Sequence, residues 1–155
     1  SMDTAAASGH GHKDKRVEIA IRNWAPRFVA AGVPLADFEE VTAGIASWDD
    51  WCAAWSARAA VHERLGREAL AAGYRYSAGQ HLTRAALCYH FGKFMFVHRY
   101  EEMKRAHAKV VECRALALPH LDPPGERVKI SFKNKYLYGI LRKPAGAARA
   151  PVVVI

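Results

Sequence analysis

Residues 122–142 read DPPGERVKISFKNKYLYGILR, and the spacing of apolar side chains changes within this segment. Before Pro123-Pro124 the apolar residues recur every three or four positions, which is the period of a helix. After it, apolar and polar residues alternate over 128–133, which predicts a half-buried strand. Asn134-Lys135 is expected to form the turn into a second strand at 136–142. The sequence therefore predicts a helical region followed by β structure.

Upstream, the chain from Asp14 to about Leu118 is predicted to form successive helices. The clearest begins after Ser47, which can cap it, and ends near Gly73. Its buried face is expected to consist of Trp48, Trp51, Cys52, Trp55, Ala59, His62, Gly66 and Ala69. We expect Trp51, Trp55 and Tyr89 to be mostly buried among the helices.

Two shorter helices are expected before this one and two longer helices after it. Gly32 is expected to close the first, and the second begins at Pro34 and buries Leu35. Ser77 is expected to cap the next helix, which runs through Val97. The last helix spans about Tyr100 to Leu118 and is ended by Pro119.

Composition excludes several classes of protein. Apolar residues make up 51% of the 155 and charged residues 25%, so most of the chain can bury a core. No window reaches the roughly 18 apolar residues of a membrane helix, and no segment is typical of a secretory signal. The three cysteines form no CxxC pair, which favours a reducing, cytoplasmic location. We predict no cofactor and no metal site, including at His10 and His12 in the flexible N-terminal tail.

The net charge of +8 is unevenly distributed. Residues 91–145 hold twelve basic and five acidic side chains, whereas residues 1–90 hold ten of each. Such a basic region suggests nucleic acid or another anionic partner. Its basic residues lie among apolar ones and form no continuous run, so we do not expect nucleic-acid binding.

The end of the sequence, Pro151–Ile155, is a continuous apolar run of the kind found in strands buried on both faces. We therefore interpret the sequence as the front part of an α/β protein. It comprises a disordered tail (1–13), a helical cap domain (14–122) and the opening β-strands of an incomplete core (123–155). Because the terminal run would expose apolar strand edge, we expect association with a second copy or with the missing core.

No local motif identifies a catalytic centre, because the chain contains no GxSxG, GxGxxG, P-loop or HExxH sequence. The candidate substrate-pocket residues are Tyr89, His90, Lys93 and Phe94. His90 and Lys93 are three positions apart and so share one face of the predicted helix. The alternative for each is a structural role, with His90 bonded to a carbonyl and Lys93 reaching solvent through its alkyl stem.

Several motifs in order resemble the start of an α/β-hydrolase subfamily that includes dihydroxypseudooxynicotine hydrolases and fermentation-respiration-switch esterase-like proteins. They are WDDWC at 48–52, LTRAALCYHFGKFMF at 82–96, PPGERV at 123–128, GILRKP at 139–144 and the run at 151–155. The resemblance covers about residues 16–155. It implies a helical cap domain that packs over the hydrolase core and helps to form the substrate pocket.

The resemblance also implies a serine nucleophile that attacks a carbonyl, and cleavage of an ester or of a carbon–carbon bond next to a ketone. The catalytic triad is then expected after Ile155, so this chain alone is expected to be inactive. The alternative left open by the residues is a stand-alone helical interaction module that binds an acidic partner through 91–145.

Overall fold

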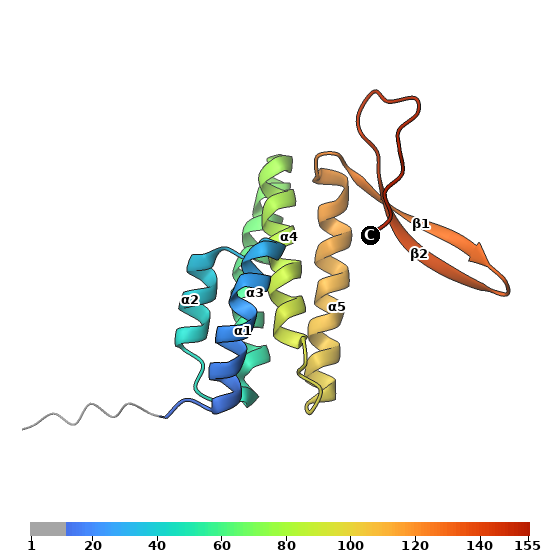
Figure 1. Ribbon diagram of the computed structural model, residues 1–155. Helices are drawn as coiled ribbons and strands as arrows, with labels where there is room; N and C mark the ends of the chain where they lie inside the picture. The colour runs from blue at the N-terminus through green and yellow to red at the C-terminus, as the bar shows by residue number, and fades with distance from the viewer. Residues whose placement is uncertain (1–11) are drawn as a thin grey trace, which may run out of the picture.

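The computed structural model describes residues 12–155, in which helices are followed by one β-hairpin (Figure 1). The helices are α1 (Lys15–Ala31), α2 (Leu35–Ala43), α3 (Trp51–Ala71), α4 (Arg75–Lys93) and α5 (Tyr100–Ala117). Two 3₁₀ turns, η1 (Trp48–Asp50) and η2 (Leu118–His120), precede α3 and follow α5. The strands are β1 (Gly125–Phe132) and β2 (Lys135–Arg142). The predicted fold class, a helical region followed by opening strands, is confirmed.

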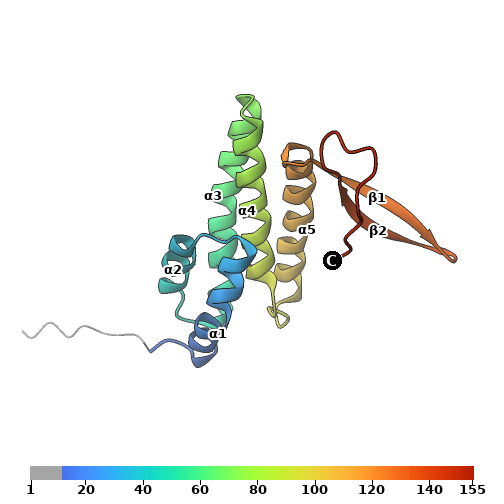
Figure 2. The ribbon, with the colours of Figure 1, turned by 45° about the horizontal axis from the view of Figure 1, so that its top comes forward.

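The long helices α3, α4 and α5 lie side by side, with α4 in the middle, and α1 and α2 pack on the α3 side (Figures 1 and 2). Glycines allow α3 and α4 to approach closely. A Cβ atom at Gly92 would lie 2.9 Å from the Cβ of Trp55, and one at Gly66 would lie 2.7 Å from Leu82 Cγ. The predicted place of Gly66 on the buried face of α3 is confirmed. No helix in residues 12–155 combines the length and apolar character needed to cross a membrane.

An aromatic core joins α1 and α2 to α3 and α4. The ring of Phe28 stacks on Phe91 at a centroid distance of 3.8 Å and meets Trp55 edge-on at 5.2 Å. Trp51 and Trp55 are fully buried and Tyr89 is 5% exposed, which confirms their predicted burial. Trp51 Nε1 also donates to the carbonyl oxygen of Phe91 at 3.1 Å, so its polar atom is satisfied inside the core.

The ends of the helices agree in part with the caps and stops predicted from the sequence. Gly32 ends α1 with a φ of 112°, as predicted, and Gly73 follows α3 with a φ of 82°. Ser47 caps the 3₁₀ turn η1 through a bond from the backbone N–H of Asp49, rather than capping α3 directly. Leu35, predicted to be buried in α2, is 53% exposed because it lies at the first position of that helix.

Two predictions about α4 are wrong. The helix begins at Arg75, so Ser77 lies inside its first turn and does not cap it. It ends at Lys93, because Phe94 adopts an extended backbone and Met95 a φ of 60°. This change of direction buries Phe96 completely, and Val97 is left 69% exposed outside any helix.

The hairpin projects away from the helices beyond α5 (Figure 1). Its strands are antiparallel, with Val128 opposite Gly139 and Ile130 opposite Leu137. The turn is Lys133-Asn134, one residue earlier than predicted, and Lys133 has a φ of 53°. The predicted half-burial is also wrong, because no layer within residues 12–155 covers the strands and Ile130 is 51% exposed.

The C-terminal apolar run does not form the predicted buried strand. Within the described residues 152–155 pair with no strand, and each of their side chains is at least 82% exposed. An apolar run becomes a buried strand only where neighbouring strands supply hydrogen bonds and side-chain contacts. At the other end, residues 1–11, and with them His10, lie outside the described residues. His12 is exposed, and Lys13 Nζ donates to the carbonyl oxygen of Thr42 at 2.6 Å.

Candidate functional site

The four residues predicted to line a substrate pocket lie at the C-terminal end of α4, but their side chains point in two directions. Tyr89 points towards α3 and α5, where its hydroxyl donates to Glu63 Oε1 at 3.1 Å. His90 packs on Phe94 at a centroid distance of 6.1 Å, and Phe94 packs in turn on Trp24 of α1 at 5.4 Å. Successive helical residues are rotated by about 100°, so adjacent positions face different neighbours.

Tyr89 lies in a groove between α3 and α5. The cavity has a volume of about 330 Å³ and is lined by Ala53, Ser56, Tyr89, Glu102, Arg105, Ala106 and Lys109. Small residues from α3 and α5 leave the space, and α4 supplies its aromatic wall. Two cations face one carboxylate here, so the groove suits a ligand with an apolar body and a negative or carbonyl oxygen.

A buried carboxylate organises the polar side of this groove. Glu63 accepts hydrogen bonds from Tyr89, from Arg67 Nε at 2.9 Å and from Lys109 Nζ at 3.2 Å. Burial acts to raise the pKa of Glu63, but the bonds from Arg67, Lys109 and Tyr89 outweigh it and hold the pKa below its usual value. Burial and the neighbouring Glu63 charge raise the pKa of Tyr89, so its phenol stays a hydrogen-bond donor.

The other predicted pair lies in a more apolar environment. Burial lowers the pKa of His90, and the nearby Lys93 and His107 lower it further, so the imidazole is neutral at pH 7. Within residues 12–155 the side chains of His90 and Lys93 have no hydrogen-bond or ion-pair partner, although their backbone carbonyls accept from Phe94 and Phe96. Their polar atoms therefore remain available to a ligand, and their role in a pocket stays a prediction.

A second buried polar cluster joins α2, α3 and α4. Asp37 contacts Arg58 Nη1 at 2.8 Å and His62 Nε2 at 2.6 Å, and the ring of His62 stacks on His81 at 5.8 Å. Burial lowers the pKa of His81, helped by His62 and Arg84. The sequence places His62 on a buried face, but no local signal indicates Asp37 or His81, because these residues meet only in the folded chain.

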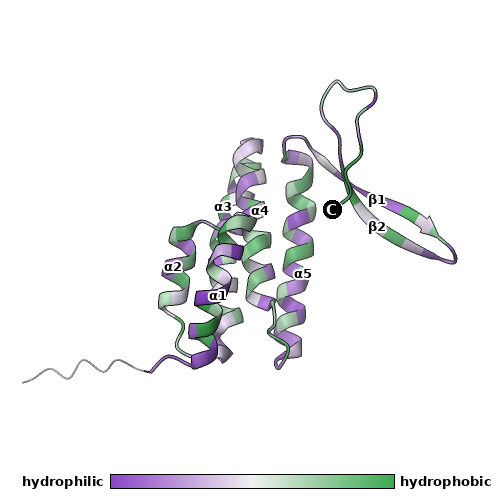
Figure 3. Cartoon of the chain, viewed as in Figure 1, coloured by the Kyte–Doolittle hydropathy of each residue, from purple (hydrophilic) through white to green (hydrophobic). Residues whose placement is uncertain are grey.

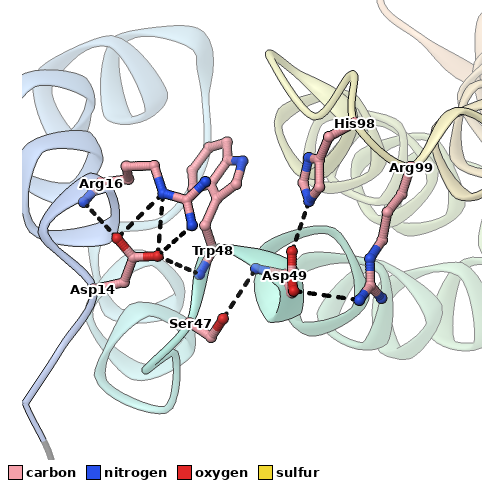
Figure 4. A network of polar contacts seen from close by, with 7 residues as sticks. All are labelled: Asp14, Arg16, Ser47, Trp48, Asp49, His98 and Arg99. Carbon is pink, nitrogen blue, oxygen red and sulfur yellow. Dashed lines mark hydrogen bonds and ion pairs between the residues drawn. The ribbon is translucent and has the colours of Figure 1, made fainter.

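A third network joins the N-terminal end of α1, the turn η1 before α3 and the connection that leads into α5 (Figure 4). The Asp14 carboxylate caps α1 and binds Arg16, and these bonds lower its pKa to about 2. Asp49 accepts from His98 at 2.7 Å and pairs with Arg99 at 3.4 Å, which fixes the α4–α5 connection against η1. This network is more than one-third exposed at Asp49 and His98, so we assign it a structural role. In the described part of the chain no three potential metal ligands come together.

Comparison with known proteins identifies a hydrolase as a relative. No model of a protein family matches the chain. The chain is 29% identical over 140 residues to 2,6-dihydropseudooxynicotine hydrolase of Paenarthrobacter nicotinovorans, covering 86% of this chain and 35% of the relative. The solved structure of a 2,6-dihydroxy-pseudo-oxynicotine hydrolase matches 81% of this chain, with a TM-score of 0.71 and 28% identity. The chain thus spans about a third (35%) of the length of these relatives.

These matches confirm the resemblance to this hydrolase, and the helices followed by two antiparallel strands match a helical cap and the start of a hydrolase sheet. The resemblance to esterase-like proteins remains a prediction.

Proposed function

We propose that the chain is the helical cap and the opening strands of a serine-nucleophile α/β-hydrolase that cleaves an ester or a carbon–carbon bond next to a ketone. The observation that carries the proposal is the match to one hydrolase by both sequence and structure, over more than four-fifths of this chain. The nucleophile, the acid and the histidine would then belong to the hydrolase core outside these 155 residues, and this chain alone would be inactive.

In this proposal the helices shape the substrate pocket and perform no covalent chemistry. The groove beside Tyr89 offers the cations Arg105 and Lys109, since the phenol proton of Tyr89 is already donated to Glu63, and the His90–Lys93 side of α4 offers a neutral imidazole and an unpaired ammonium. Either set can orient a carbonyl oxygen through hydrogen bonds while aromatic rings contact the apolar part of the substrate. The substrate would be a small ester or ketone.

The test is to express the longest chain that the reading frame of the gene encodes and to treat it with a fluorophosphonate probe, which labels activated serines. We expect one labelled serine beyond residue 155 and hydrolysis of an activated ester or a β-diketone. Alanine at the labelled serine should abolish both. The 155-residue chain is the matched control and should remain unlabelled. A longer chain that is neither labelled nor hydrolytic would overturn the proposal and favour a helical interaction module.

The predicted pocket residues can be tested in the same longer chain. His90→Gln and Lys93→Met should each lower kcat by about tenfold while leaving Tm unchanged, because each removes a polar group with no partner in the described residues. Lys104→Met, at an exposed lysine of α5, is the control and should behave like the unmodified enzyme. Normal kcat together with a lowered Tm would assign both residues to structure.

A further inference from the structure

The β-hairpin is attached to the helices at its base. There β1 packs on η2, and Figure 3 shows that both strands then project clear of the helices, with hydrophobic segments along them. Ile130 of β1 and Leu137 of β2 are 51% and 54% exposed, so packing of such side chains on the helices does not set the direction of the hairpin. That direction depends on residues 118–125, which comprise η2, the connection after it and the first residue of β1. We call this segment the elbow.

The elbow meets α4 at Gly79, where two backbones are in close contact. A Cβ atom on Gly79 would lie 2.7 Å from the carbonyl oxygen of His120 and 3.1 Å from its carbonyl carbon. These are backbone atoms, which cannot rotate away as the end of a side chain can. The helix itself does not require glycine, because the φ of Gly79 is not in the left-handed region and alanine is more favourable inside a helix. Glycine is required here by the close approach of the elbow.

A side chain at position 79 would displace the elbow rather than α4. The helix is held between α3 and α5, and its residues Ala78 and Leu82, close to Gly79, are fully buried. His120 is only partly buried, and after it the chain leaves the helices for the hairpin. The elbow is therefore the less constrained of the two backbones.

Both strands are tied to the elbow, so a displacement there moves the whole hairpin. Gly125 lets β1 begin against η2, since a Cβ atom on it would lie 2.7 Å from Leu118 Cδ2. Arg142, the last residue of β2, donates from Nε to the carbonyl oxygen of Pro123 at 2.8 Å. Each strand has eight residues and is about 26 Å long, so a rotation of about 10° at the elbow moves the far turn by about 4 Å.

We propose that Gly79 is a positioning residue for the hydrolase reaction, because it fixes the angle between the helical cap and the sheet that begins with the hairpin. This inference rests on the proposed function. The strands lead into the part that would carry the nucleophilic serine, whereas the candidate pocket groups of the cap lie on α3, α4 and α5. A change of angle would move these groups relative to the serine, and a misplacement of about 1 Å can slow a reaction about 100-fold.

Spin labels on the 155-residue chain test the angle directly. Lys104→Cys places one label on α5 and Lys135→Cys places the other at the start of β2, and both native lysines are exposed. The three native cysteines are buried, and burial raises the pKa of Cys88 and Cys113 to about 12, so they should react slowly. Pulsed electron paramagnetic resonance should give one narrow distance between the labels. Gly79→Ala should shift that distance by about 4 Å or more, or broaden it.

Gly92→Ala is the matched control. A Cβ atom at Gly92 would also lie too close to a neighbour, 2.9 Å from Trp55 Cβ, but this contact is between α3 and α4 and away from the elbow. Gly92→Ala should lower the Tm and leave the distance between the labels unchanged. A label distance that Gly79→Ala does not change, or that is already broad with glycine at this position, would overturn the inference.

The effect on the reaction is measured in the longest chain that the gene encodes. There Gly79→Ala should lower kcat/KM for an activated ester by about tenfold or more. The rate of fluorophosphonate labelling should stay the same, because this small probe needs only the activated serine. Gly92→Ala should retain its kcat/KM per labelled molecule.

Two results in the longer chain would overturn the inference. An unchanged kcat/KM in Gly79→Ala would show that the angle does not matter for the reaction, and a loss of labelling together with hydrolysis would assign Gly79 to folding alone. A shifted label distance in the 155-residue chain, combined with a longer chain that has no labelled serine, would retain the role of Gly79 in the angle and reject the proposed function.

Discussion

Trp55→Ala is expected to lower the free energy of unfolding of the helical region by about 3–5 kcal/mol. The indole is fully buried, contacts Phe28 and Phe38 at centroid distances of 5.2 and 5.8 Å, and lies against Gly92 of α4. Its truncation opens a cavity where α1, α2, α3 and α4 meet, and rigid helices can fill that cavity only in part. Urea unfolding followed by circular dichroism measures the loss.

The control for this prediction is Tyr76→Ala, since Tyr76 lies on α4 and is 70% exposed. It should change the free energy of unfolding by less than about 0.5 kcal/mol. Trp55→Phe should recover much of the loss, because it keeps a large ring and removes an indole N–H that is buried without a partner in the described residues. Equal stability of Trp55→Ala and Tyr76→Ala would show that the aromatic core is assigned wrongly.

Glu63→Ala is expected to have the second-largest effect and to lower the free energy of unfolding by about 2–3 kcal/mol. Most of this loss comes from the hydroxyl of Tyr89, which would stay buried without its acceptor. Arg67 and Lys109 also lose a partner, but both are more than 40% exposed, so water compensates them. Glu112→Ala is the matched control, because Glu112 pairs with the same two cations while being 48% exposed. It should cost less than about 1 kcal/mol.

The same pair of variants predicts a difference in acid stability. The pKa of Glu63 is lower in the folded chain than its usual value of 4.5, so the unfolded chain binds the proton more readily. The stabilisation by Glu63 is therefore fully present above about pH 4.5 and is lost as the pH falls through the folded pKa. Glu63→Ala should show a smaller fall in Tm on acidification than Glu112→Ala. Parallel Tm profiles for the two variants would contradict the assigned role of Glu63.

The order of the helices and strands could largely be predicted from the sequence, because each element depends on contacts between residues that are close in the chain. The change of period at Pro123-Pro124 separates helices from strands, and Gly32 and Gly73 provide the left-handed positions that end α1 and follow α3. The burial of Trp51 and Trp55 also follows from helical spacing. These signals are local, and tertiary packing did not override them.

The candidate site could be predicted only in part. The spacing of His90 and Lys93 places them together at the end of α4, yet adjacent Tyr89 faces a different groove, and which neighbour each meets depends on where α1, α3 and α5 pack. Asp37, His62 and His81 come together across 44 residues, and no short motif marks such contacts. The packing of whole helices decides which of their polar atoms have a hydrogen-bond partner and which have none in the described residues.

The sequence by itself determined the periodicity, the helix stops and the two-strand pattern of this protein, since these follow from backbone geometry and side-chain alternation. Only the tertiary structure decided which faces are covered. The alternation over 128–132 predicts one buried side, but burial needs a second layer, and within residues 12–155 that layer is absent from the hairpin. Likewise, the apolar character of 152–155 favours a strand, but strand formation depends on the hydrogen bonds of neighbouring strands, which a local pattern cannot supply.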